Sequence, residues 1–304
     1  MSSKRLSIAT VTDGRPGNAV QARGLAEAIA RLRDADIVAH DVDVKPLLRE
    51  TVLRLTGRPL RRGPLADLVI GAGRRGNLVA AEARAGGSPA VAILRPGLPL
   101  NRYDAVVTPE HDGLTGPKVL TTLGSLNALS SERIAEAAKG LPPLPLRTLV
   151  ALVGGPSRTA TFEAEEEAAL LADLCRFAAA GYAIAATPSR RTPQNVIEQM
   201  RAAVPGIIIW DGTPPNPYPG WLHGAAAILV TADSVNMASE AAATGTPVFV
   251  SGTDRIAPKF RRFHAALARR GITRPAAEGP AEWSYDPLRE ADRIAPLILE
   301  RLGL

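Results

Sequence analysis

A short polar loop at residues 13–18, with the sequence DGRPGN, gathers residue types that could bind a substrate and accept a proton. The apolar run at 6–11 predicts a β-strand before the loop, and the helical spacing of apolar residues over 20–32 predicts a helix after it. Glycine lets the backbone approach a ligand closely, and free amides at a helix start favour an anion. The loop matches neither the dinucleotide fingerprint nor the Walker loop. We interpret Asp13 as the first candidate for a general base, with a simple tight turn as the alternative.

Two further strand ends in the first half carry charged side chains. The predicted strand at 65–70 leads into GAGRR at 71–75, where paired guanidinium groups suit an anion or a solvated turn equally well. The predicted strand at 105–108 is followed by Glu110 and His111, which are the next candidates for the base. The other histidines are dispersed, so no metal site is predicted. The substrate-binding candidates of this half are Gly14, Arg15, Asn18, Arg74 and Arg75.

The second half repeats the pattern at three strand ends. Predicted strands at 149–153, 182–187 and 206–210 are followed by GGPS, SRRTP and a WDG turn. Paired glycines fit the close approach of a diphosphate, and arginine binds phosphate oxygens through two donors at once. Ordinary turns are the alternative interpretation. The candidates for binding a nucleotide here are Gly154, Gly155, Ser157, Ser189, Arg190, Arg191 and Asp211.

The segment 231–248, TADSVNMASEAAATGTPV, combines a predicted helix with an out-of-place carboxylate. Asp233 or Ser234 can cap the helix, whose first amides would favour phosphate oxygens. Glu240 lies among small apolar residues, where a carboxylate is costly without a partner, and a ribose diol is one such partner. The alternative is an exposed glutamate on a solvated face. We add Ser234, Ser239 and Glu240 to the nucleotide-binding candidates.

The alternation of short apolar runs and helical stretches predicts an α/β fold with mostly parallel sheets. Three prolines in LPPLPLR at 141–147 indicate a linker between two Rossmann-like halves. We therefore expect an N-terminal domain at 1–140, a C-terminal domain at 148–285 and a terminal helix within 286–304 that packs back on the body. Ligands of such folds bind beyond the carboxyl ends of the strands.

The chain of 304 residues has a formal net charge of +6. Because no dense Lys/Arg tail is present, a charge-driven nucleic-acid binder is excluded. The basic excess suits a phosphorylated ligand or an anionic lipid surface, or reflects a compositional bias toward arginine. The amphipathic stretch at 288–302 leaves a peripheral contact with an anionic membrane open.

The single cysteine, Cys175, lies in an apolar helical stretch, which predicts a buried, inert thiol and a reducing compartment. No signal peptide is visible, and no run approaches the roughly 18 apolar residues that span a bilayer. We expect a cytoplasmic protein, while its oligomeric state stays open.

These segments together resemble the Elm-type mitochondrial fission proteins of bacteria and plants. The matching stretches are DGRPGN, GAGRR, RPGLP at 95–99, PEHD at 109–112, GSLN at 124–127, GGPS, TPSRRTP, NPY at 216–218 and the segment 231–248. The second half is also similar to the donor half of GT-B glycosyltransferases such as the murein-precursor N-acetylglucosaminyltransferase. That similarity implies phosphate near Gly154, Gly155 and Ser157, and phosphate or ribose near the three candidates of 231–248. The chain departs from the pattern at Pro156, which removes one amide donor.

The resemblance implies an inverting, metal-independent GT-B glycosyltransferase. Its co-substrate would be a nucleotide-diphosphate sugar, with no tightly bound cofactor and an acceptor that the sequence does not identify. Two alternatives stay open, a nucleotide-sugar epimerase on the same fold and a non-catalytic nucleotide-binding or membrane-recruitment protein.

Overall fold

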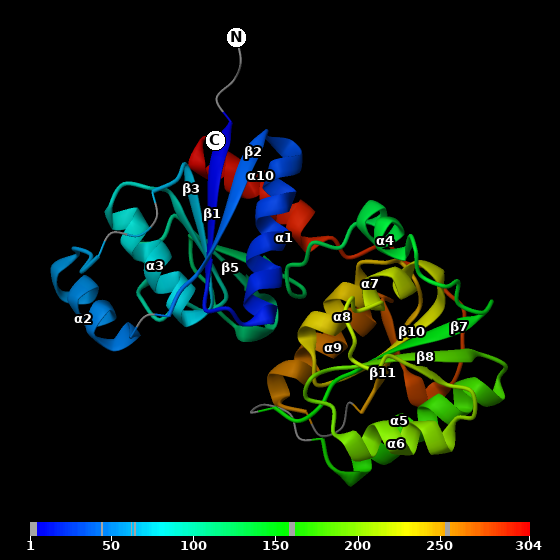
Figure 1. Ribbon diagram of the computed structural model, residues 1–304. Coiled ribbons are helices and arrows are strands. Elements are labelled where there is room, and N and C mark those ends of the chain that lie inside the picture. Colours follow the sequence, from blue (N-terminus) through cyan, green and yellow to red (C-terminus); the bar gives the residue numbers. More distant parts are fainter. Residues whose placement is uncertain (1–4, 44, 62, 64, 158–161, 253–255) are drawn as a thin grey trace. The chain divides into compact units, whose positions relative to one another are not determined.

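The computed structural model describes residues 5–43, 45–61, 63, 65–157, 162–252 and 256–304. The chain divides into two compact units, the first made of Met1–Ala128 with Arg289–Leu304 and the second of Leu129–Leu288. Each unit is built around its own six-stranded parallel sheet (Figure 1). This is the α/β architecture that the alternating pattern predicts.

The sheet of the first unit has the strand order β2-β1-β3-β4-β5-β6. Its strands are β1 (Leu6–Thr12), β2 (Ala35–Asp41), β3 (Leu68–Ala72), β4 (Ala90–Ile93), β5 (Ala105–Pro109) and β6 (Val119–Thr122). Its helices are α1 (Pro16–Leu32), α2 (Pro46–Thr56), α3 (Gly73–Ala85) and α10 (Glu290–Leu302), with short 3-10 turns at Leu100–Arg102 and Glu110–Asp112. The central strand β3 is buried along its whole length, whereas β2 is an exposed edge strand. Central parallel strands read as continuous apolar runs for this reason.

The sheet of the second unit has the order β12-β11-β10-β7-β8-β9. Its strands are β7 (Thr148–Val153), β8 (Ala183–Pro188), β9 (Ile208–Ile209), β10 (Ala225–Thr231), β11 (Val248–Ser251) and β12 (Thr273–Pro275). Its helices are α4 (Ser131–Ala138), α5 (Ala164–Ala179), α6 (Gln194–Ala203), α7 (Tyr218–Trp221), α8 (Val235–Ala242) and α9 (Pro258–Arg269), with 3-10 turns at Leu222–Gly224 and Ala276–Glu278. Phe177 anchors the core, edge-on to Tyr182 and Phe249 at 5.4 and 4.7 Å between ring centroids.

The boundary between the units differs from the proline-rich segment that the sequence suggests. The structure divides the chain after Ala128, because α4 packs against α7 of the second unit. The approach is close: a Cβ added at Gly220 would lie 2.4 Å from the carbonyl oxygen of Ala137. The prolines at 142–145 therefore lie inside the second unit and not between the two.

The terminal helix α10 completes the core of the first unit by packing on α1 (Figure 1). Ile294 and Ile298 are fully buried in one cluster with Leu25 and Ile29. The carboxylate of Glu290 accepts the backbone amide of Leu123 at 3.1 Å, which fixes the start of the helix. The apolar face of α10 is thus occupied by its own unit and is not available to a lipid surface.

Two further findings concern Cys175 and membrane spans. Cys175 is exposed on α5, so the prediction of a buried thiol is wrong, because the helix turns this position outward from the cluster that holds Leu174 and Phe177. Within the described residues, no helix is both long and apolar enough to cross a membrane.

Truncating a buried side chain of α10 should destabilise the protein. Ile294→Ala removes packing against α1 and should lower the free energy of unfolding by about 2–5 kcal/mol. The measurement is urea unfolding followed by circular dichroism. Leu297→Ala, on the exposed side of the same helix, is the control and should cost less than about 1 kcal/mol. Equal losses for the two variants would show that α10 is not a core helix.

Candidate functional site

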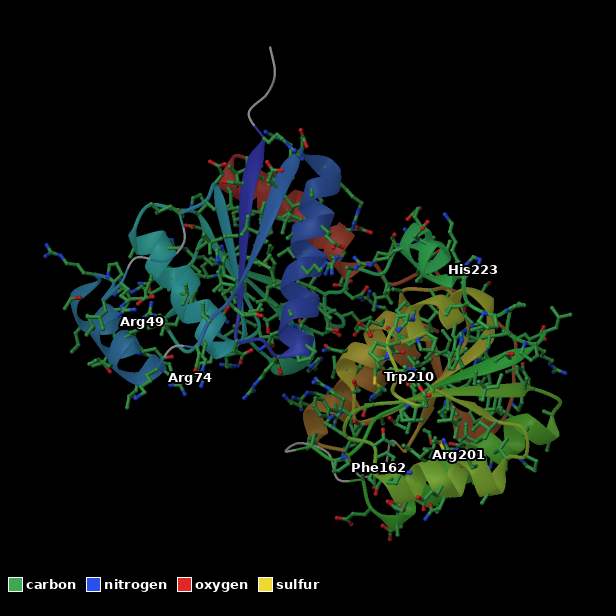
Figure 2. All side chains as sticks on the ribbon, viewed as in Figure 1. Arg49, Arg74, Phe162, Arg201, Trp210 and His223 are labelled. Atoms are coloured by element: carbon green, nitrogen blue, oxygen red, sulfur yellow. The ribbon has the colours of Figure 1, made fainter. Side chains whose placement is uncertain are left out.

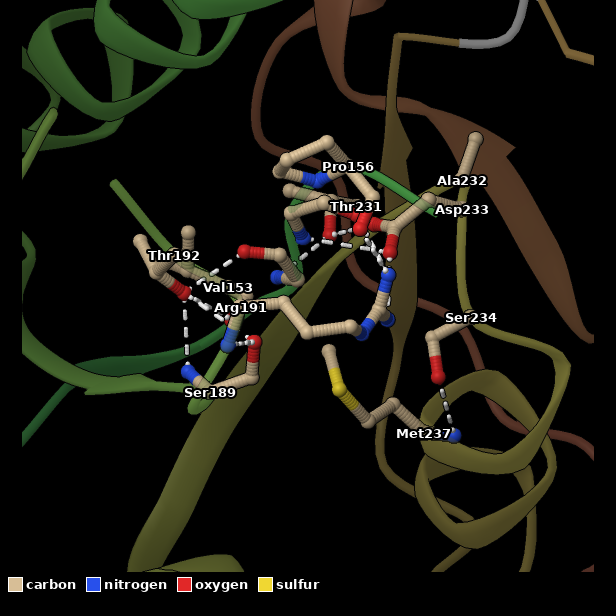
Figure 3. A network of polar contacts seen from close by, with 12 residues as sticks. Val153, Pro156, Ser189, Arg191, Thr192, Thr231, Ala232, Asp233, Ser234 and Met237 are labelled. Carbon is tan, nitrogen blue, oxygen red and sulfur yellow. Dashed lines mark hydrogen bonds and ion pairs between the residues drawn. The ribbon is translucent and has the colours of Figure 1, made fainter. Parts of the chain in front are cut away.

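Three loops meet at the carboxyl ends of adjacent strands in the second unit. They follow β7, β8 and β10, which are neighbours in the sheet. Their centre is Asp233, whose side chain is only 3% exposed. Figure 3 shows the contacts that converge on it.

Asp233 accepts hydrogen bonds from the loops after β7 and β8 and from the last residue of β10. The backbone amide of Gly155 donates at 3.2 Å, the hydroxyl of Thr231 at 2.6 Å and the guanidinium of Arg191 at 2.8 Å. Arg191 also donates to the carbonyl oxygens of Gly155 and Pro156. A buried carboxylate is stable only when its oxygens are satisfied in this way. Asp233 therefore holds the loops in one arrangement.

The glycine pair is explained by this internal network. A Cβ at Gly154 would lie 2.0 Å from an oxygen of Asp233, and one at Gly155 would lie 2.2 Å from the carbonyl oxygen of Arg191. The amide of Gly154 donates to Thr231 and that of Gly155 to Asp233. Both amides are thus engaged within the protein, and the close neighbour that requires glycine is protein rather than ligand.

The loop after β8 is a compact turn. The hydroxyl of Thr192 lies 2.6 Å from the carbonyl oxygen of Gly154 and 2.9 Å from the amide nitrogen of Ser189, which donates to it. Both arginines of this turn are exposed, but the guanidinium of Arg191 takes part in the Asp233 network. Of the two arginines, Arg190 is therefore the one that forms no ion pair with a described residue.

Helix α8 begins at Val235, two residues after Asp233. The hydroxyl of Ser234 caps it by accepting the amide of Met237 at 3.3 Å. The first amides of a helix have no acceptor inside it, so this end carries partial positive charge. Ser239, by contrast, is completely buried, and its hydroxyl donates to the carbonyl oxygen of Val235 at 2.7 Å. The structure places Ser239 in the core and not at the helix start.

Glu240 lies on α8 and has the protein partner that its apolar surroundings require. The hydroxyl of Tyr218, on α7, donates to its carboxylate at 2.6 Å. Burial raises the pKa of Glu240 to about 7, and the hydrogen bond from Tyr218 opposes that rise. Burial likewise raises the pKa of Tyr218 well above its usual value. Glu240 therefore exchanges a proton in the physiological range, which is a common property of functional carboxylates.

Asp211 lies away from this group, after the edge strand β9. It is exposed and accepts the amide of Thr213 at 2.8 Å, which lowers its pKa. Its observed role is to close a local turn.

In the first unit, the loop after β1 holds Asp13 in a defined position. Its carboxylate, 10% exposed, accepts the side-chain amide of Asn18 at 2.8 Å and lies 3.4 Å from the guanidinium of Arg15. Gly14 adopts a φ of +72°, which favours glycine. Gly73 at the start of α3 is so close that a Cβ there would lie 2.3 Å from the amide nitrogen of Asn18. The predicted loops after β1 and β3 thus meet.

A hollow of about 350 Å³ lies beside this loop, between α1 and the edge strand β2. Its polar lining comes from Thr10, Thr12, Arg23, Glu27, His40 and Asp41. The hydroxyl of Thr12 donates to Asp41 at 2.8 Å and accepts the amide of Gly14 at 3.1 Å, so the hollow and the loop share a wall. The sequence does not identify Asp41 as a candidate, because no motif surrounds it and its partner Thr12 lies 29 residues away in the chain.

The arginines of the GAGRR segment are engaged elsewhere. Arg74 forms a two-pronged ion pair with Glu50 of α2, at 3.0 and 2.8 Å, and this pairing raises the pKa of Arg74. Arg75 pairs with Asp43 at 2.6 Å. Figure 2 shows Arg74 at the side of the first unit where α2 lies. Both side chains thus link α3 to the α2 region instead of facing Asp13.

Glu110 and His111 follow β5, which is separated from β1 by two intervening strands. At roughly 4.8 Å per strand step, this is about 14 Å from the loop that carries Asp13. Glu110 is exposed, whereas His111 is buried. The three base candidates are therefore not one cluster. Among the described residues, no group of three or more His, Cys, Asp or Glu side chains could hold a metal ion.

Two Rossmann-like units with parallel six-stranded sheets define the GT-B fold class, and comparison with solved structures agrees. The UDP-GlcNAc 2-epimerase of Neisseria meningitidis, bound to UDP-GlcNAc, matches with a TM-score of 0.55 and 12% identity over 98% of this chain and 100% of that one. AviGT4, a glycosyltransferase of avilamycin A biosynthesis, matches with a TM-score of 0.52 and 16% identity over 98% and 97%. At such identities the likeness shows the fold alone.

The sequence comparisons identify the family. The family model described as mitochondrial fission ELM1 matches residues 16–302, so the chain belongs to this family. The mitochondrial fission protein ELM1 of Arabidopsis thaliana is 31% identical over 277 residues, which is 79% of this chain. The match spans 64% of the plant protein, less than two thirds of its length.

Breaking the Asp233 network should destabilise the second unit. Asp233→Ala leaves Arg191 and the amide of Gly155 without their acceptor and should lower the free energy of unfolding by about 3–5 kcal/mol. All three tryptophans, Trp210, Trp221 and Trp283, belong to this unit, so their fluorescence in urea reports its unfolding. The control Glu198→Gln, an exposed carboxylate on α6, should stay within about 0.5 kcal/mol of the parent. A loss below about 1 kcal/mol for Asp233→Ala would contradict the central role of this carboxylate.

Proposed function

We propose that this protein is a metal-independent glycosyltransferase that takes a nucleotide-diphosphate sugar as donor and binds its nucleotide on the second unit. The observation that carries the proposal is Glu240, a partly buried carboxylate on α8 whose pKa is about 7 and whose recorded partner is the hydroxyl of Tyr218. A ribose diol offers the same kind of donor as the tyrosine hydroxyl. The carboxylate of Glu240 would accept hydrogen bonds from that diol, and its burial means that little further water must be removed.

The spacing along α8 fits a nucleoside diphosphate. Ser234 and Glu240 are six residues apart, which is about 9 Å along a helix axis. The diphosphate would lie at the amides of the first turn, where the helix dipole and the exposed Arg190 favour negative charge. The ribose would then reach Glu240. Helix dipole and guanidinium together offset the diphosphate charge without a divalent cation, which is the basis for proposing metal independence.

The first unit would bind the acceptor and supply the general base. The acceptor hydroxyl attacks the anomeric carbon of the sugar, the bond from that carbon to the diphosphate oxygen breaks, and the electron pair leaves with the diphosphate. The acceptor's proton passes to a carboxylate, for which Asp13 is our candidate, since Asn18 and Arg15 fix its orientation. The hollow lined by Thr12 and Asp41 offers room for a polar acceptor beside it.

A nucleotide-sugar epimerase is the second candidate, because an enzyme of that kind shares the fold. It needs no acceptor, so conversion of the donor alone to a second sugar nucleotide would assign the protein to this class. A non-catalytic protein on the same fold would bind the nucleotide and leave it unchanged. Chromatographic analysis of the products distinguishes the glycosyltransferase, the epimerase and the non-catalytic protein.

Nucleotide binding should depend on Glu240 and on pH. With UDP-, GDP-, ADP-, TDP- and CMP-linked sugars and EDTA present, one nucleotide class should raise the unfolding temperature, and a ligand at 100 times its Kd stabilises by about 2.7 kcal/mol. Because the ionised carboxylate accepts more hydrogen bonds and the pKa of Glu240 is raised to about 7, affinity should increase as the pH rises from 6 to 8. Below that pKa the gain approaches tenfold per pH unit.

The matched variants isolate the contribution of Glu240. Glu240→Gln should remove the pH dependence and weaken binding by about 10- to 100-fold, the range for a hydrogen bond to a charged group. Glu198→Gln, on α6, should behave like the parent. Tight binding by the Glu240→Gln variant with an unchanged pH profile would sink the assignment, as would a complete absence of binding by the parent.

Asp13 should affect turnover and not donor binding. Once a donor and acceptor are known, Asp13→Asn should lower kcat by about 10²- to 10⁴-fold, since it removes the base and preserves the side chain's shape. The Kd for the nucleotide should stay unchanged. Glu110→Gln is the matched comparison on the same unit, and the opposite ranking of the two variants would move the role of base to Glu110.

A further inference from the structure

The helix α2 and the segment after it carry an unusual group of exposed leucines. Of the eleven large apolar side chains that the described residues expose, five lie between residues 47 and 65, with exposed fractions of 50% to 81%. They are Leu47, Leu48, Leu55, Leu60 and Leu65. We refer to these leucines, together with the exposed cations Lys45, Arg54, Arg58 and Arg61, as the leucine–arginine face.

The leucines of α2 form one side of the helix. Leu47, Leu48 and Leu55 are spaced one, seven and eight residues apart, which confines them to an arc of about 100°. The opposite side is fixed to the first unit, because Leu53 is fully buried and Glu50 pairs with Arg74. Arg49, labelled in Figure 2, pairs with Glu82. The helix is therefore anchored with its apolar side outward, and the leucines are not part of the core.

The charge of this face is strongly one-sided. Residues 45–65 contain six Lys or Arg residues and a single acidic residue, Glu50, which is buried and paired. Lys45, Arg58 and Arg61 are exposed, and none of the three forms an ion pair with a described residue. Cations interspersed with exposed leucines match a surface that is negatively charged outside and apolar just beneath.

We propose that the leucine–arginine face docks on anionic phospholipid, with the leucines entering the interface and the cations contacting the headgroups. An amphipathic helix of this composition binds membranes in that manner. Anionic lipid strengthens the binding of each nearby Lys or Arg by about fivefold. This inference is independent of the glycosyltransferase proposal, because none of these residues belongs to the nucleotide site.

Two other partners are less well matched. Residues 45–65 contain no aromatic side chain that could stack on bases, which argues against single-stranded nucleic acid. A second copy of the same face would oppose its exposed cations with an equal set of cations, which disfavours self-association. An anionic lipid surface satisfies both the charge and the leucines.

The test is flotation of the full chain with vesicles of phosphatidylcholine, alone or with about one third phosphatidylglycerol. The parent protein should bind the anionic vesicles at least about tenfold more strongly, and high salt should weaken this binding. L47S/L48S/L55S should weaken it at least about tenfold. K45Q/R58Q/R61Q should weaken it by about 100-fold on anionic vesicles only.

The control variants remove exposed leucine or arginine side chains that lie outside the leucine–arginine face. L146S replaces a leucine that is 97% exposed on the second unit, and R201Q/R269Q/R270Q removes three exposed charges from α6 and the end of α9. Both should change vesicle binding by less than about threefold and, like the test variants, keep the parent's melting temperature and nucleotide affinity.

Three outcomes would overturn the proposal. Equal weakening by the control charges would show a net-charge effect with no docking face. Absence of flotation, with L47S/L48S/L55S converting a dimer to a monomer in sedimentation velocity, would assign the face to a second copy. If the protein neither floats with the vesicles nor forms a dimer that depends on these leucines, the face binds neither lipid nor a second copy.

Discussion

The arrangement of the second unit depends on one buried carboxylate. Asp233 is almost fully removed from water, and its burial is tolerated because the loops after β7 and β8 and the last residue of β10 donate to it. The position of α8 follows from this, since its capping residue, Ser234, directly follows Asp233 in the chain. The nucleotide site that we propose is therefore preorganised by contacts that do not touch the ligand. Such support is what keeps a binding site in its productive geometry.

The same loops show why the motifs could be recognised while their physical reasons could not. Paired glycines after β7 indicate that something approaches the backbone, and the sequence suggests a diphosphate. The structure shows that Asp233 and the backbone of Arg191 are the close neighbours. They lie 36 to 79 residues away in the chain, and local spacing does not reveal such partners. Glu240 is a parallel case, since its apolar surroundings predict a partner, but Tyr218 lies on a different helix.

The elements themselves could be predicted where burial is one-sided or complete. The alternation of apolar runs and helices was enough for the α/β class and the two halves, because central parallel strands are apolar throughout. α2 was not predicted, because its leucines face outward and its inner side is held largely by ion pairs. The boundary between the units was predicted in the wrong place, since prolines signal extended chain and do not reveal that α4 packs on α7.

The return of the chain to the first unit at α10 has a consequence for how the protein is made. The second unit is one continuous segment and can fold as soon as residue 288 has left the ribosome. The first unit is discontinuous, and the helix α1, which also packs on its own sheet, gains the part of its cover that α10 provides only after Ile294 and Ile298 have been synthesised. During translation the core of the first unit thus stays incomplete on the α10 side of α1 until that helix has been made. Loss of α10 would therefore damage the first-made unit and leave the later-made unit intact.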